Sequence, residues 1–116
     1  MFNNAEDKIN PVDAYREIEA IGKVLRKSIK HMPRYHRYNE GDRIVNILLD
    51  VKIALKLTCK GRNYHLDTDK LYNDLITLGT LIDDCIEDGA LLLKGKYTVH
   101  EPRMRLIALF KMFPEA

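Results

Sequence analysis

Apolar side chains recur at helical spacing along most of the chain. In the first segment they fall three or four residues apart, on one stripe of a helix, at Ala14, Ile18, Ile21, Leu25, Ser28 and Met32. The segment opens with Asn10-Pro11, where asparagine can cap the free amides and proline fits the first helical position. Because Pro33 disfavours helical geometry at the residue before it, the pattern predicts a helix from Pro11 to near His31.

A second apolar segment is broader than the first. Its main stripe consists of Ile44, Leu48, Val51 and Leu55, and its flanking positions are Val45, Ile47, Leu49 and Ala54. This breadth predicts burial on more than one side. Asn39 can cap the start, with Glu40 and Asp42 in the first turn, where the helix dipole favours negative charge. At the other end, Lys60-Gly61 supplies a cation and a left-handed stop.

A third apolar segment keeps a heptad register through three repeats. Its positions are Leu71, Leu75, Leu78, Ile82, Cys85, Gly89 and Leu92. Either Asp67 or Thr68 can cap this helix, and Gly95 is expected to close it.

A fourth segment has an inner stripe of Leu106, Phe110 and Phe113 and is expected to end at Pro114. Two starts fit the pattern. In one, residues 98–101 (TVHE) form a capping box; in the other, Glu101 is the cap and Pro102 takes the first helical position. The sequence does not decide between them.

These segments predict a single all-α domain. No segment alternates with a period of two between hairpin turns, so no strand is expected. Amphipathic helices joined by short connections favour an antiparallel up-down-up-down four-helix bundle over residues 11–116. Residues 1–10 lack periodicity and are expected to form a flexible N-terminal lead-in.

Composition and short motifs argue against several classes of protein. No apolar run approaches the roughly 20 residues that a membrane helix needs, so no membrane partner is expected. The N-terminus is acidic and polar rather than signal-like, which favours a cytoplasmic location. Cys59 and Cys85 form no C-x-x-C pair and are expected to be packed thiols. No acid stands three residues before any histidine, and no glycine-rich phosphate loop occurs, so no metal, cofactor or catalytic residue is predicted.

Charge is distributed unevenly, although the formal net charge is only +2. Between residues 20 and 39 every charged side chain is basic, and we call this set the basic track: Lys23, Arg26, Lys27, Lys30, Arg34 and Arg37. Residues 65–92 carry a single base, Lys70, against the acids Asp67, Asp69, Asp74, Asp83, Asp84, Glu87 and Asp88. The last four acids lack the spacing of a calcium loop and are interpreted as a solvated or partner-facing surface, with a hard-cation site as the alternative. From residue 94 to 111 the balance is positive again.

The basic track has two possible roles. Its first four members lie on the outer side of the first helix, opposite the apolar stripe, and the last two continue into the connector. Such a track can neutralise several phosphates, and Tyr35, His36 and Tyr38 can stack on unpaired bases. Alternatively, cations near a helix C-terminus are favoured by its dipole, and tyrosines at the end of a bundle can cap the core.

One pattern in the track is also typical of an enzyme. Arg26 and His31 have the arginine–four residues–histidine spacing that resembles the active-site motif of HEPN ribonucleases, which are helical bundles. That resemblance implies a histidine acting as general acid or base on a ribose hydroxyl and an arginine steadying the phosphate. Here Lys27 follows the arginine, where that family prefers a small polar residue.

The stretch MPRYHRYNEGDRI, residues 32–44, resembles a signature of small four-helix-bundle proteins. The group includes the accessory variability determinant (Avd) of diversity-generating retroelements and the proteins encoded in ribosomal RNA intervening sequences. The likeness extends loosely over residues 14–112. The matching positions are Pro33, Arg34, Arg37, Gly41 and Arg43. In the resemblance, Pro33 sets the turn and Gly41 allows close helix approach.

This resemblance implies a ring-shaped homo-oligomer, typically a homopentamer, without catalytic activity. Retroelement members bind the reverse transcriptase of the element and its template RNA through a positively charged surface. The nucleic-acid-binding residues predicted here are Lys23, Arg26, Lys27, Lys30, Arg34, Tyr35, Arg37 and Arg43.

The chain differs from the retroelement members in two respects. Its third helix is acidic where theirs tends to carry arginines, and it ends without their Gly-Gly-Trp-like segment. An acidic helix could instead meet the basic first helix of a neighbouring subunit. The sequence therefore predicts an RNA- or reverse-transcriptase-binding accessory protein, with an oligomeric protein scaffold and an RNA-cleaving enzyme as alternatives.

Overall fold

The computed structural model describes residues 9–113, and in this range the protein is all-helical. The long helices are α1 (Pro11–Ile29), α3 (Asp42–Lys60), α4 (Thr68–Glu87) and α5 (His100–Phe110). Between α1 and α3 lie a short helix, α2 (Arg34–His36), and a π-helical turn, η2 (Arg37–Gly41). The described residues contain one isolated bridge, between Leu92 and Thr98, and no strand. The predicted all-α class with four long helices is confirmed.

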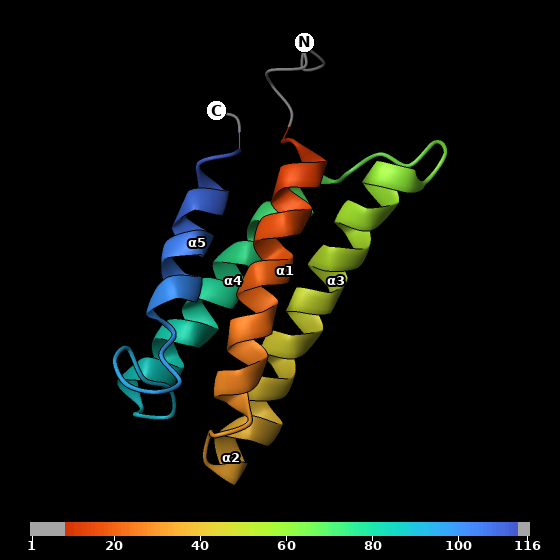
Figure 1. Cartoon of the computed structure of the whole chain (residues 1–116). Helices are drawn as coiled ribbons and strands as arrows, with labels where there is room; N and C mark the ends of the chain where they lie inside the picture. Colours follow the sequence, from red (N-terminus) through yellow and green to blue (C-terminus); the bar gives the residue numbers. More distant parts are fainter. Residues whose placement is uncertain (1–8, 114–116) are drawn as a thin grey trace.

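The four long helices pack around one core. Helix α1 packs against α3 and α5, and α4 packs against the same two helices. The molecule is elongated, with extents of 46 × 24 × 19 Å. Figure 1 shows α2 and the loop between α4 and α5 at one end of the molecule and the α3–α4 loop at the other. We call the first of these the connector end, comprising residues 23–43 and 84–98.

The core follows the predicted apolar stripes closely. All six predicted positions of the first stripe are buried, as are the four main positions of the second. The predicted burial of the second helix on more than one side is wrong: Leu49 is 46% exposed, because α3 meets neighbours on one face only. None of the helices in residues 9–113 combines the length and apolar character needed to span a membrane.

Two predicted helix caps are confirmed. The side chain of Asn10 accepts hydrogen bonds from the backbone N–H groups of Val12 and Asp13, at 3.0 and 3.2 Å. Asp67 caps α4 by accepting from the N–H of Lys70 at 3.0 Å. The predicted stop at Pro114 and residues 1–8 of the predicted lead-in lie outside the described range. Ile9, at the end of that lead-in, is buried.

The second helical segment begins earlier than predicted. Helical backbone resumes at Arg34, directly after Pro33, and continues through η2 into α3. Asn39 is therefore inside the helix and caps nothing; its Nδ2 donates to the carbonyl of Tyr35 at 2.6 Å. Proline restricts the residue before it, while its own φ of −53° suits the position preceding a helix.

The ends of three other helices also differ from the prediction. Helix α4 ends at Glu87, since Gly89 adopts a φ of +77°. The last two predicted heptad positions, Gly89 and Leu92, therefore lie outside the helix. The predicted left-handed stop at Gly61 is wrong, because this residue is extended with a φ of −80°. Helix α5 begins at His100, and the Thr98 hydroxyl accepts from its N–H at 3.1 Å. Neither predicted start of that helix is observed.

Candidate nucleic-acid interface

The predicted nucleic-acid-binding residues gather at the connector end. Those that are exposed are Lys23, Lys27, Lys30, Arg34, Tyr35 and Arg43, while Arg26 and Arg37 are half-buried. Lys23, Lys27 and Lys30 follow the outer face of α1, opposite its buried stripe, over about 10 Å at 1.5 Å per residue. These residues belong to α1 and its C-terminal end, α2, η2 and the first turn of α3, and we refer to them together as the basic surface.

The cations of this surface form no ion pairs with the described carboxylates. Within residues 9–113, no carboxylate oxygen lies within 4.0 Å of a cationic nitrogen of the basic track or of Arg43. Some basic residues elsewhere are paired: Lys70 pairs with Asp74 at 2.8 Å, and Arg105 pairs with Glu17 at 3.2 Å. Hydrogen bonds to Glu101 and Glu17 raise the pKa of Arg105, and a hydrogen bond to Asp74 raises the pKa of Lys70.

Two arginines of the track contribute to packing as well as to charge. The guanidinium of Arg26 lies over Gly22, where a β-carbon would be only 3.2 Å from its Nη1 atom. Arg37 donates from Nη1 to the carbonyl of Lys30 at 3.4 Å, and its Nε is buried without a hydrogen-bond partner. Arg37 thus ties the connector to the end of α1 and has less freedom to reach a ligand.

The tyrosines of the connector are accessible for stacking. Tyr35 is 72% exposed and Tyr38 is 59% exposed. The guanidinium carbons of Arg34 and Arg37 lie 5.7 and 5.2 Å from the centre of the Tyr38 ring, so this ring is held by cation–π contacts. Tyr35 touches only His36, edge to face at 5.4 Å, among the aromatic pairs of the described residues. Tyr35 therefore offers the more open surface for a base.

The structure adds the α4–α5 loop to this surface, which the sequence did not predict. His31 stacks on Tyr97 with ring centres 3.8 Å apart, and the Ser28 hydroxyl donates to the carbonyl of Tyr97 at 3.0 Å. The Nζ of Lys96 lies 5.5 Å from the Tyr97 ring centre, next to the end of α1. The positive balance after residue 94 was the only sequence signal for this arrangement.

Acidic residues also reach the connector end. Of the acids in residues 67–88, Asp67 caps α4, while Asp74 and Asp83 form ion pairs with bases of the same chain. Asp88, at the end of α4, lies beside His36 and Glu40, and one ligand-type atom from each falls within 4.8 Å of the others. The sequence indicated a cation site at Asp88 only as an alternative, formed with the acids of its own helix. It did not predict this grouping, because Asp88 is far from His36 and Glu40 along the chain.

The two residues of the ribonuclease-like motif point to different places. The Arg26 guanidinium packs over Gly22, one turn towards the start of α1. His31 follows the end of α1 and stacks on Tyr97. Each of the two side chains thus has a packing partner of its own, and the ribonuclease-like alternative stays a prediction.

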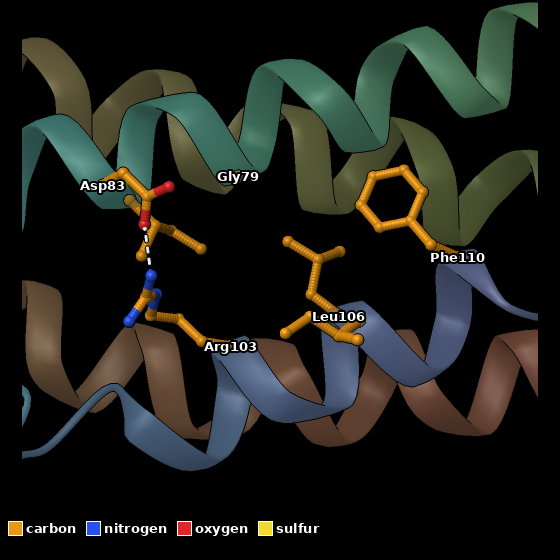
Figure 2. Close-up of a pocket in the computed structure, with 7 residues that line it drawn as sticks. Gly79, Asp83, Arg103, Leu106 and Phe110 are labelled. Carbon is orange, nitrogen blue, oxygen red and sulfur yellow. Dashed lines mark ion pairs between the residues drawn. The ribbon is translucent and has the colours of Figure 1, made fainter.

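A separate groove runs between α4 and α5. Figure 2 shows it bounded by the Arg103–Asp83 ion pair, at 3.0 Å, and by Phe110. The groove encloses about 200 Å³ and is lined mainly by apolar side chains. Gly79 forms part of its wall, and a β-carbon there would lie 3.4 Å from Cδ2 of Leu106. The groove lacks the convergent polar groups that fix a small ligand, so it is a weaker candidate than the connector end.

Comparison with known proteins assigns the chain to no family. No family model, curated protein or solved structure matches it. The resemblance to the Avd group therefore stays a prediction carried by residues 32–44. Functional inference rests on the surface that the structure assembles.

Proposed function

We propose that this protein is a non-enzymatic accessory protein that binds RNA at the connector end, alone or together with a reverse transcriptase. The observation that carries the proposal is the basic track with Arg43, whose cations have no carboxylate partner in residues 9–113. Uncompensated cations gain binding free energy when phosphates replace their counterions. Tyr35 and Tyr38 are exposed among these cations, and Tyr35, whose ring carries no cation, suits stacking on an unpaired base.

The proposed architecture is an antiparallel up-down-up-down bundle within a ring-shaped homo-oligomer, a homopentamer by resemblance. Figure 1 supports the bundle, since successive connections lie at alternate ends of the molecule. Exposed apolar side chains support the assembly: Leu49, Ile53 and Leu57 are spaced four residues apart on the outer face of α3 and are each more than 40% exposed. A cytoplasmic location is part of the same proposal.

Fluorescence anisotropy with a labelled single-stranded RNA tests the binding surface. The variant Lys27→Ala/Lys30→Ala/Arg34→Ala removes three exposed cations from the connector end. For single strands, each phosphate contact makes the slope of the logarithm of the association constant against the logarithm of salt concentration more negative by about 0.7. The loss of three contacts therefore predicts roughly 100-fold weaker binding at about 0.1 M salt.

A matched control removes the same net charge elsewhere. Lys60, Arg62 and Lys111 are exposed and lie at or beyond the helix ends opposite the connector end. Their triple alanine variant should bind RNA within about threefold of the wild type, because remote charges are largely screened at this salt. Equal losses in the two variants, or no RNA binding by the wild type, would refute the proposed surface.

A second candidate function, an oligomeric protein scaffold, rests on the apolar ridge of Leu49, Ile53 and Leu57. Large exposed apolar patches mark protein interaction sites. Ile53→Glu should then convert an oligomer into monomers in light scattering, while Asn73→Glu, at an exposed position on α4, should not. A wild type that is monomeric at all concentrations would exclude this function. Dissociation by high salt alone would instead indicate that basic and acidic faces join the subunits.

A further inference from the structure

A mixed group of metal-ligand side chains lies where η2 meets the end of α4. A ring nitrogen of His36, Nδ1, lies 3.2 Å from Oε1 of Glu40, one helical turn away. Asp88 reaches the same place from α4, and the three ligand atoms lie within 4.8 Å of one another. The side chains of His36 and Glu40 are 20% and 25% exposed, so the pair is shielded but open to solvent on one side.

The backbone on the η2 side of this group is held firmly. Gly41, which closes η2, packs so tightly that an added β-carbon would lie 3.0 Å from Cγ2 of Ile29 and 3.4 Å from the carbonyl of His36. The same turn is π-helical, and single π-helical turns are frequent at functional sites. His36 and Glu40 therefore project from a fixed segment.

The backbone on the α4 side is fixed as well. The N–H of Asp88 donates to the carbonyl of Asp84 at 2.9 Å. After the left-handed Gly89, the N–H groups of Ala90 and Leu91 both donate to the carbonyl of Cys85, at 2.7 and 3.1 Å. Ala90 and Leu91 are buried, which anchors the turn in the core. Only the side chain of Asp88 is free to adjust its rotamer.

We propose that His36, Glu40 and Asp88 form a binding site for a divalent transition-metal ion. At ligand distances of about 2.0–2.2 Å, tetrahedral ligand atoms are separated by about 3.3 Å. His36 Nδ1 and Glu40 Oε1 already have this separation, at 3.2 Å, in a hydrogen bond whose proton the ion would replace. From a distance of at most 4.8 Å, the Asp88 carboxylate needs to move by roughly 1.5 Å, within reach of a side-chain rotation.

The donor set determines the class of ion. One imidazole and two carboxylates suit Zn²⁺ and other first-row divalent ions, whereas Mg²⁺ and Ca²⁺ prefer oxygen ligands alone. A hydrogen bond with its own backbone, with further contributions from His36 and Arg43, lowers the pKa of Glu40, so this ligand is ionised near neutral pH. Two carboxylates balance the charge of the ion, and water fills the open coordination position.

The neighbouring thiol of Cys85 is not among the ligand atoms that lie within 4.8 Å of one another. The proposed ion would link η2 to the end of α4 and would hold the connector end together through residues that are far apart in the sequence.

Isothermal titration of the untagged full chain with Zn²⁺, after treatment with a chelator, tests the site. We expect saturable binding of one ion per chain and a rise in the unfolding temperature that EDTA reverses. His36→Ala and Asp88→Asn should each weaken binding by more than about tenfold, because losing a ligand costs at least as much as losing an outer-shell partner. Mg²⁺ should bind much more weakly than Zn²⁺.

Two variants serve as matched controls. Asp84→Asn removes an exposed acid from the same end of α4, and His100→Ala removes an exposed histidine elsewhere. Both should bind Zn²⁺ within about threefold of the wild type. The proposal is overturned if the wild type shows no saturable Zn²⁺ binding, or if Asp88→Asn or His36→Ala binds as tightly as the controls.

Discussion

The salt dependence of RNA binding can be predicted from the geometry of the connector end. The exposed cations of the basic track are Lys23, Lys27, Lys30 and Arg34, and none of them has a carboxylate partner within residues 9–113. If each neutralises one phosphate of a single strand, the logarithm of the association constant should fall with the logarithm of salt concentration with a slope of about −2.8. A rise from about 50 to about 200 mM salt should then weaken binding roughly 50-fold.

Removing two of these cations changes the slope by a defined amount. Lys27→Ala/Lys30→Ala leaves two phosphate contacts, so the slope should be about −1.4, and the same rise in salt should weaken binding only about sevenfold. Lys27→Arg/Lys30→Arg should keep the slope of the wild type, since it keeps the charge. Anisotropy titrations at four or more salt concentrations measure each slope. A wild-type slope near zero, or equal slopes in the wild type and the alanine variant, would refute the electrostatic reasoning.

Three further predictions concern stability. Tyr97→Ala should lower the free energy of unfolding by about 1–2 kcal/mol in urea, because it removes the ring stacked on His31, whereas Tyr97→Phe should be nearly neutral. Asp67→Ala should cost about 1 kcal/mol by removing the cap of α4, and equal losses in Asp67→Ala and Asp69→Ala would contradict the capping role. Burial raises the pKa of Cys85 from 9.0 to about 11. Since the unfolded thiol ionises first, stability should fall as the pH rises through this interval, and Cys85→Ala should remove that part of the pH profile.

Features set by local chemistry were predictable from the sequence. Asn10 and Asp67 cap their helices because a short polar side chain before a helix can reach the free N–H groups without help from the rest of the fold. The buried stripe of α1 follows from its spacing alone. The end of α4 was missed because its apolar register continues past Gly89, while the left-handed backbone of this glycine ends the helix.

The composition of the candidate site depended on long-range contacts. The basic track could be predicted because its members are neighbours along one segment. Lys96 lies near the basic track because its neighbour Tyr97 stacks on His31. No periodic pattern in the sequence connects the α4–α5 loop with the end of α1. Likewise, Asp88 meets His36 only because α4 ends opposite η2. Such contacts depend on helix lengths and packing, which the pattern of apolar residues does not specify.

Photo-crosslinking of the full chain to a single-stranded RNA containing 4-thiouridine, followed by mass spectrometry of the peptides, locates the bound RNA on the protein. If RNA binds at the connector end, crosslinks should occur there, with Tyr35 foremost and the peptide containing Tyr97 among the rest. Lys27→Ala/Lys30→Ala/Arg34→Ala should remove these crosslinks. Crosslinks concentrated instead at Tyr64, in the α3–α4 loop at the opposite end, would show that the connector end is not the RNA-binding surface.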